Sequence, residues 1–475
     1  NIDASTVSIS SNVTIAQATA NTSTLTGALG TALTASYDAS GALSSLQDFS
    51  AAVNSTTDVE ITLSLNTNSG SDENVLNSTV NLNANQGSAV ARGNVVVTNL
   101  SVDGTNIDGG TGANDSELNG AFGANTAAFV ASSDQSTASG LVSSDSSSMT
   151  VLLDLTSSTT QDTDATLKTS TVTLSSNRSE STATSNNADN TLTLGSAGST
   201  SALSATGGVL NGQIISGSGS LTTATGGMTV TADIDTSGTT TSPNTVNAVA
   251  GSQLSLASNV STATATGNTA DNTLTAISTQ ITAGTALDAN ANSNTPLADA
   301  GFSLLNQQGV SNVAGINLTS TNTANTVSAL LTAEDTAVAT STVTLTGNSF
   351  SAATYANDAE NTMTLGAAGT TANLSSTGAV VSEQQTNTVV ALATAGGTVT
   401  VDIDSTDIAE TAMTGSTLSV SGNSSLASTT LNNALNSLTA ISTNIAAGAA
   451  NTDAQISGTD IDGAYAIGNT QTTIA

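Results

Sequence analysis

Apolar and polar residues alternate along much of this chain, with the period of two that is typical of half-buried β-strands. Within residues 1–30 the apolar members of this pattern are Val7, Ile9, Val13 and Ile15. The pattern returns in 58–100. From about residue 150 onwards, short runs of this kind are separated by Gly, Asn and Asp, which favour turns. Residues 31–52 fit a short helix instead. The pattern therefore predicts an all-β protein with one short helix near its start.

One stretch, residues 170–195, recurs in altered form three more times. In each copy an asparagine is followed at a fixed distance by a hexapeptide of the type Ala-Asp-Asn-Thr-Leu-Thr. The asparagines are Asn177, Asn259, Asn348 and Asn423, and the hexapeptides begin at Ala188, Ala270, Ala359 and Ala434. The copies are 82 residues apart (177 to 259), then 89 (259 to 348), then 75 (348 to 423). Fixed spacing within copies and variable spacing between them indicates one structural unit that is used repeatedly.

The copies alternate between two subtypes, so the chain carries a super-repeat. The first and third share Ser-Thr-Val-Thr-Leu at 170–174 and 341–345, and the second and fourth share Leu-Thr-Ala-Ile-Ser-Thr at 274–279 and 438–443. Weaker relatives surround Asn12 and Asn85. In such arrays the stability is a sum over units and their neighbour interfaces.

Two architectures fit repeats of about 80 residues. In a β-solenoid (a parallel β-helix) each copy would form about four rungs of roughly 20 residues. In tandem immunoglobulin-like β-sandwiches each copy would be one domain with a thick core between two sheets. Aromatic residues make up only 2% of the chain and there are only two prolines, Pro243 and Pro296, which disfavours the sandwich. We therefore expect the solenoid.

The hexapeptide indicates how a rung is built. Leu192 and Leu194 should face inwards, while Thr191, Thr193 and Gly195 face outwards. We expect Asn190 at the preceding turn, since asparagine tolerates left-handed backbone and can stack its amide in ladders between rungs.

The repeats also predict a division of the chain. We expect a β-rich N-terminal segment over 1–100, with the helix near 31–52, and an irregular insertion or cap over 101–150. The repeat array should occupy 151–450, and a capping or assembly segment should follow over 451–475.

Charge excludes several classes of partner. The formal net charge is −32, with 35 Asp and Glu residues against three Lys and Arg. Such a surface repels nucleic acid and anionic membranes. It favours solubility and attracts cations, and a high-salt setting would screen its self-repulsion. There is no apolar run long enough for a membrane span, so we expect none. The chain starts at Asn1 without Met, which fits a secreted form that has lost a signal peptide and fits a trimmed chain equally well.

Catalysis is not expected. The chain has no His and no Cys, so catalytic triads and zinc sites built on these residues are unavailable. Three tyrosines and five phenylalanines cannot line much of a carbohydrate-cleaving cleft. We therefore expect a protein that is not an enzyme.

The tripeptide Asp-Ile-Asp occurs three times and is the candidate metal site. On a strand, two residues that are two apart share a face, so both carboxylates would point outwards around an inward Ile. Paired hard oxygen ligands of this kind can bind Ca²⁺, and a solvated acidic face is the alternative. The candidate ligands are Asp233, Asp235, Asp402, Asp404, Asp460 and Asp462.

The repeated Ala-Asp-Asn-Thr-Leu-Thr motif with its Ser, Thr and Ala flanks resembles the β-strand-repeat proteins of bacterial surfaces, a class that includes solenoidal adhesins, S-layer proteins and fibre subunits. The resemblance covers about 170–448. It implies a secreted, extracellular structural subunit that polymerises into a filament or surface layer through end-to-end solenoid or strand contacts. The segments 1–15 and 453–475 are the expected joints. The alternative is an adhesin stalk or passenger module, with a cell-surface anchor or a polysaccharide as partner.

Overall fold

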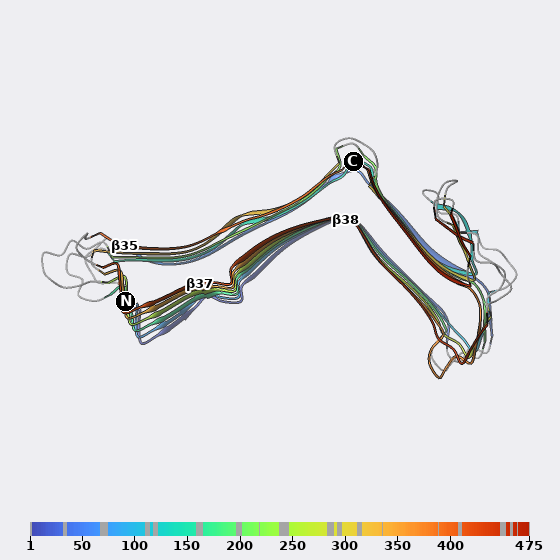
Figure 1. Ribbon diagram of the computed structural model, residues 1–475, viewed down its shortest axis with the longest axis horizontal. Helices are drawn as coiled ribbons and strands as arrows, with labels where there is room; N and C mark the ends of the chain where they lie inside the picture. The colour runs from blue at the N-terminus through green and yellow to red at the C-terminus, as the bar shows by residue number, and fades with distance from the viewer. Residues whose placement is uncertain are drawn as a thin grey trace.

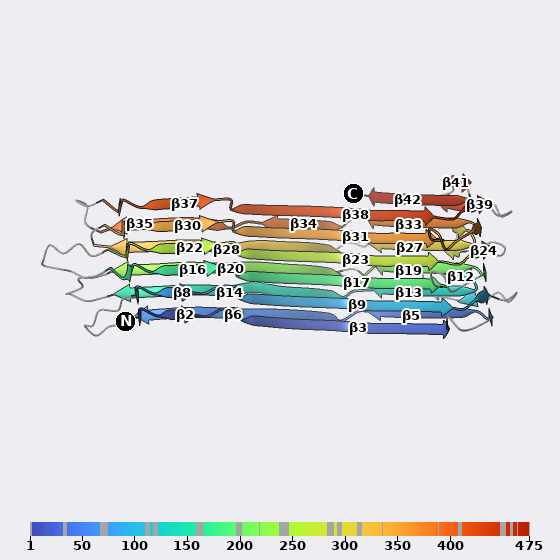
Figure 2. The same cartoon turned by 90° about the horizontal axis from the view of Figure 1, so that it is seen from below.

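The computed structural model describes residues 2–31, 36–66, 75–109, 115–116, 122–157, 165–195, 202–217, 219–236, 247–282, 289–291, 297–310, 316–334, 336–387, 389–406, 411–446, 453–456, 459–462 and 464–474. Over these residues the regular structure is entirely β-strand. The strands form a β-solenoid of six coils, which superimpose when viewed down the stacking axis (Figure 1) and lie one above another from the N-terminal to the C-terminal coil (Figure 2).

The first five coils each pass in turn through six parallel sheets, here named A to F, and the described residues of the sixth coil pass through A to E. Sheet A contains β1 (Ile2–Asp3), β7 (Val75–Leu76), β15 (Leu167–Lys168), β21 (Val249–Ala250), β29 (Val338–Ala339) and β36 (Met413–Thr414). Sheet B contains β2 (Thr6–Ser8), β8 (Thr79–Asn81), β16 (Thr171–Ser175), β22 (Gln253–Ala257), β30 (Thr342–Thr346) and β37 (Thr417–Ser421). Sheet C, with the longest strands, contains β3 (Val13–Gly30), β9 (Gln86–Asp103), β17 (Arg178–Leu194), β23 (Val260–Ala276), β31 (Ser349–Leu365) and β38 (Ser424–Ala440).

The chain then turns and comes back over the first layer. Sheet D, at the turn, contains β4 (Tyr37–Asp38), β10 (Asn106–Asp108), β18 (Ala202–Ser204), β24 (Gln280–Thr282), β32 (Asn373–Ser375) and β39 (Asn444–Ala446). Sheet E contains β5 (Gly41–Phe49), β13 (Phe129–Thr137), β19 (Gly207–Ile215), β27 (Phe302–Val310), β33 (Gly378–Asn387) and β42 (Tyr465–Ile474). Sheet F contains β6 (Ala52–Asn66), β14 (Leu141–Ser157), β20 (Leu221–Thr236), β28 (Asn317–Ala333) and, in the fifth coil, the two pieces β34 (Val390–Ala395) and β35 (Thr398–Ser405).

Short strands outside the coils form a separate, antiparallel sheet. They are β11 (Asp115–Ser116), β12 (Phe122–Thr126), β25 (Ala289–Ala291), β26 (Leu297–Asp299), β40 (Asp453–Ile456) and β41 (Thr459–Asp462).

The interior between the two layers has two large apolar regions, and smaller apolar clusters lie between them among polar side chains. Sheets A, B and F enclose the first, which includes Leu174, Ile234 and Val343. Sheets C, D and E enclose the second, which includes Leu192 and Phe302. Where each coil bends (Figure 1), the interior also holds columns of buried Asn, Gln, Ser and Thr side chains.

The expected β-solenoid is confirmed, but the expected length of a rung is wrong. Equivalent asparagines on neighbouring coils are 73, 92, 82, 89 and 75 residues apart, so each sequence repeat is a single coil and not four. Asn12 and Asn85, the weak relatives, are full members of this series. The inward Leu192 and Leu194 are confirmed, since both are completely buried. Asn190 was expected at a turn and instead lies inside strand β17, with its side chain buried.

The first 150 residues contribute strands to the same stack. The helix expected within 31–52 is wrong for the described part of that segment, because residues 41–49 form β5 and pair in parallel with β13. Within 101–150, β13 and β14 pair in register with the coils on both sides, while β11 and β12 belong to the antiparallel sheet.

Candidate cation sites and self-association surfaces

Two of the three Asp-Ile-Asp tripeptides lie in the same columns of sheet F. Asp233 and Asp235 are on β20, and Asp402 and Asp404 are on β35. The fourth coil lies between them and places Leu330 and Thr332 at these positions. The two carboxylate pairs are therefore two strands apart. As expected, the intervening isoleucines face inwards, since Ile234 is buried and Ile403 packs against the core.

The neighbour that sequence reasoning missed is Asp154 on β14, which pairs directly with Asp233. Partial burial, and after it the charge of Asp154, raises the pKa of Asp233 and also that of Asp235 above the ordinary value. For Asp233, the charge of Asp235 adds to the effect. Like charges at this spacing repel, so the protonated forms of Asp233 and Asp235 are favoured relative to an isolated aspartate.

The third tripeptide is separate from the other two. Asp460 and Asp462 lie on β41 and pair antiparallel with β40, where Asp462 is opposite Asp453. Among the described residues, no group of three or more His, Cys, Asp or Glu side chains has an arrangement that could hold a metal ion. Calcium at the Asp-Ile-Asp pairs therefore stays a prediction.

A groove of about 470 Å³ crosses five coils at the middle of sheet C. Its acidic members are Asp189, Asp271, Asp358 and Glu360. Three of them form a column, because Asp271 pairs with Asp189 on one side and with Glu360 on the other. Burial first, and then these two neighbours, raises the pKa of Asp271. The acidic second residue of the hexapeptide in one coil therefore lies beside the equivalent residue of the next coil.

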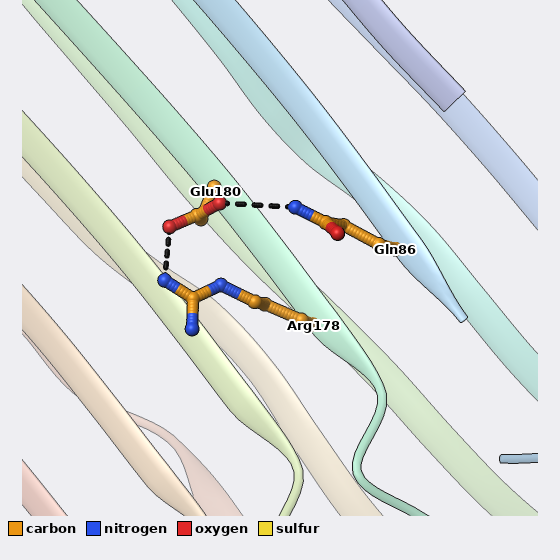
Figure 3. Close-up of polar contacts among 3 residues, drawn as sticks. All are labelled: Gln86, Arg178 and Glu180. Carbon is orange, nitrogen blue, oxygen red and sulfur yellow. Dashed lines mark hydrogen bonds and ion pairs between the residues drawn. The ribbon is translucent and has the colours of Figure 1, made fainter. Parts of the chain in front are cut away.

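One of the three basic residues is held on the outer surface of sheet C. Arg178 forms an ion pair with Glu180, two residues along β17, and Glu180 also accepts a hydrogen bond from Gln86 on the neighbouring coil (3.1 Å; Figure 3). Glu180 therefore connects two adjacent strands as well as balancing one cation.

Polar ladders run through the stack at four positions in each coil. The first is made of serines between sheets A and B, where each backbone N–H donates to the hydroxyl of the next coil, as from Ser78 to Ser170 (3.0 Å). Its members are Ser5, Ser78, Ser170, Ser252, Ser341 and Ser416.

Two ladders are made of asparagines and have the same direction. In each, the side-chain Nδ2 donates to Oδ1 of the equivalent residue on the next coil, at 2.8–3.0 Å. The members of the first are Asn12, Asn85, Asn177, Asn259, Asn348 and Asn423. The members of the second are Asn21, Asn94, Asn186, Asn268, Asn357 and Asn432. A third, shorter asparagine ladder begins at Asn190 and ends at Asn436.

The glutamine ladder in sheet E runs the other way. Each Nε2 donates to Oε1 of the preceding coil, at 2.7–3.0 Å. Its members are Gln47, Gln135, Gln213, Gln308, Gln384 and Gln471. The ladders satisfy polar groups that lie between the layers, and together they give the stack a direction.

The first and last coils end the stack with open strand edges. Here large apolar side chains are exposed, among them Val13, Ile15 and Leu46 in the first coil and Leu418, Val420, Leu426 and Leu435 in the last. In sheet F, β34 and β35 pair only with β28, because the described residues of the sixth coil add no strand there.

No family model, no curated protein and no solved structure matches this chain. In the described ranges there is no helix that could cross a membrane.

Proposed function

We propose that this chain is a non-enzymatic structural subunit of a secreted, extracellular filament or surface layer, which assembles by stacking the ends of solenoids. The observation that carries the proposal is the pair of open ends. Strand edges with unpaired N–H and C=O groups are templates for another strand, and both ends of this stack present them in several sheets at once.

The exposed apolar residues support the same proposal. Leu418 and Val420 on β37 continue columns whose preceding members, Val343 and Leu345, are fully buried. Covering such side chains contributes about 25 cal/mol for each Å² of apolar surface removed from water. A second copy on the end of the stack would bury them.

Stacking of one end on another generates an open filament, because the contact joins two different surfaces and does not close on itself. The polar ladders favour extension, since each coil repeats the donors and acceptors of the coil before it. Localisation outside the cell rests on the resemblance to surface repeat proteins.

An adhesin stalk or passenger module is the second candidate. It would use the same solenoid as a monomeric rod with a partner, such as a polysaccharide, at one place on its surface. The acidic groove at Asp189, Asp271 and Glu360 is the surface that favours this candidate.

Negative-stain electron microscopy of the purified chain, with and without a calcium chelator, separates the two candidates. We expect unbranched filaments or sheets whose smallest repeat is one six-coil unit. Their loss on chelation would make the Asp-Ile-Asp pairs part of the assembly. Isolated particles across salt and calcium conditions would contradict the polymer and favour the stalk.

A further inference from the structure

The hydrogen-bonding groups at the two ends of the stack are complementary within each ladder. We propose that the last coil of one copy binds the first coil of a second copy in a single polarity and register, with β38 paired in parallel with β3 of the second copy. This inference rests on the proposed function and adds to it the identity of the two surfaces and their alignment.

Hydrogen bonding selects this polarity. At the C-terminal end, the backbone N–H of Asn423 and its Nδ2 occupy the positions that donate to the next coil elsewhere in the ladder, as Asn348 does to Asn423 (3.0 and 2.8 Å). At the N-terminal end, Oδ1 of Asn12 accepts no hydrogen bond from a described residue, whereas Oδ1 of Asn85 accepts from Asn12. Donors at one end therefore meet acceptors at the other.

The remaining ladders agree with this choice. Asn432 presents a donor and Asn21 an acceptor, in the same sense as the first asparagine ladder. The glutamine ladder is reversed, so Gln471 presents an acceptor and Gln47 a donor. In the head-to-tail contact, each ladder therefore meets the complementary group of its own column.

The register follows from the pairing within the stack. One column of paired residues in sheet C begins at Val13 on β3 in the first coil. It ends in the sixth coil at Ser424 on β38, which pairs with Ser349 of the fifth coil. Continuing the column by one strand places Ser424 beside Val13 of the second copy. The same step places Leu426 beside Ile15, and both of these side chains are exposed, by 65% and 63%.

The column of Leu426 and Ile15 is apolar only at its two ends. Its four internal members are Ser88, Glu180, Thr262 and Ser351. Apolar residues at only the two terminal positions of an otherwise polar column fit a contact between those positions, since one would shield the other from water.

The core columns would also become continuous. Leu418 would lie beside Val7, and Ile445 beside Tyr37, each pair extending a column that is buried in the internal coils. Sheets A to E would pair directly across the joint. In sheet F, β6 of the second copy would lie two strand spacings, about 10 Å, from β34 and β35, because the sixth coil has no described strand there.

Disulfide trapping tests the polarity and the register together. The chain has no cysteine of its own, so every disulfide must come from the introduced residues. Paired residues on adjacent strands lie about 4.8 Å apart, within the separation that a disulfide can bridge. Under mild oxidation, the double variant Val13→Cys/Ser424→Cys should give a ladder of covalent multimers. A mixture of the two single variants should give dimers only, and each single variant alone should give none. The double variant Gln17→Cys/Ser424→Cys is the control, since its cysteines would be about 13 Å apart across the joint.

The outcomes separate this inference from the proposed function. Filaments by electron microscopy without covalent multimers of Val13→Cys/Ser424→Cys would overturn the alignment and leave the polymer standing. Covalent dimers of Val13→Cys alone, as abundant as those of the mixture, would overturn the polarity. Monomers in both experiments would overturn the polymer itself. As a check on folding, each variant should keep the thermal unfolding transition of the unmodified chain.

Discussion

In each coil, two residues with left-handed backbone stand directly before a ladder residue. The residues directly before the first asparagine ladder have φ values between 54° and 68°. They are Ser11, Ala84, Ser176, Ser258, Gly347 and Gly422. The left-handed residue is thus the one before the asparagine.

Replacing Ala84 by Gly should stabilise the protein. Ala84 is exposed and has φ of 54°, a conformation that costs an L-residue about 1–2 kcal/mol and costs Gly almost nothing. The greater freedom of Gly in the unfolded chain offsets part of this, so we expect a net gain of about 0.5–1 kcal/mol by urea denaturation. Ala28→Gly, at an exposed position inside β3, is the control and should lower stability. An equal loss in both variants would contradict this account of the turn.

The raised pKa values of Asp233 and Asp235 should make stability depend on pH. Burial and like charge raise the pKa of Asp233 in the folded protein above its ordinary value of 3.8. The folded state then holds the proton more tightly than the unfolded chain does, so the free energy of unfolding should fall as pH rises from about 4 through the raised pKa. Asp233→Asn should flatten this fall and be more stable than the unmodified chain at neutral pH.

Asp404→Asn is the matched control, because the position paired with Asp404 on β28 is Thr332 and not a carboxylate. If Ca²⁺ binds at the Asp154–Asp233–Asp235 cluster, it should raise the melting temperature of the unmodified chain and of Asp404→Asn. It should have no such effect on Asp233→Asn. Equal responses of all three chains to Ca²⁺ would argue against a site there.

At the scale of the element, the ladders hold the two layers together where the interior is polar. Asn268 is fully buried, accepts from Asn186 and donates to Asn357 and to the carbonyl of Gly309. Asn268→Ala removes the partner of the Asn186 amide N–H, of Asn357 Oδ1 and of the Gly309 carbonyl. We expect a loss of about 3 kcal/mol in the free energy of unfolding. Asn99→Ala, exposed on β9, should change it by less than about 0.5 kcal/mol. Similar values for the two variants would mean that the ladders do not stabilise the stack.

The same ladders explain which parts of the fold could be predicted. Alternation identified the strands, and the hexapeptide identified the inward leucines, because both depend only on neighbouring residues. The length of a coil depends on which residues meet in space. A ladder of 20-residue rungs would need an asparagine about every 20 residues, whereas Asn177 has its equivalent only at Asn259. That spacing was the available signal for a wide coil.

The candidate site was predicted only in part for a similar reason. The Asp-Ile-Asp tripeptides are visible in the sequence, but Asp154 is followed by Leu155 and Thr156 and has no such motif. It joins Asp233 only through the register between β14 and β20. Alternation in 41–49 was too irregular to exclude a helix, and there the pairing of β5 with β13 decides the structure.

At the scale of the whole molecule, charge opposes association. Two copies that each have a formal net charge of −32 repel each other strongly at an ionic strength of 0.01 M, where the screening length is about 30 Å. At 1 M the screening length is about 3 Å, so the repulsion is much weaker. We expect light scattering at fixed protein concentration to rise with NaCl. Sucrose at matched osmolality is the control. Dissociation at high salt would show instead that ion pairs hold the joint.

The spacing between paired strands also governs how the chain must fold. Each strand of sheets A to F finds its partner 70 to 97 residues away, as the pairing of Tyr37 with Ile107 and of Thr231 with Ser328 illustrates. Closing a loop of this length costs about 4 kcal/mol in chain entropy before any pairing compensates for it. The first two coils should therefore form slowly and together, and each later coil should add quickly to the edge that they provide. During synthesis, the first coil has no partner until most of the second coil has followed it.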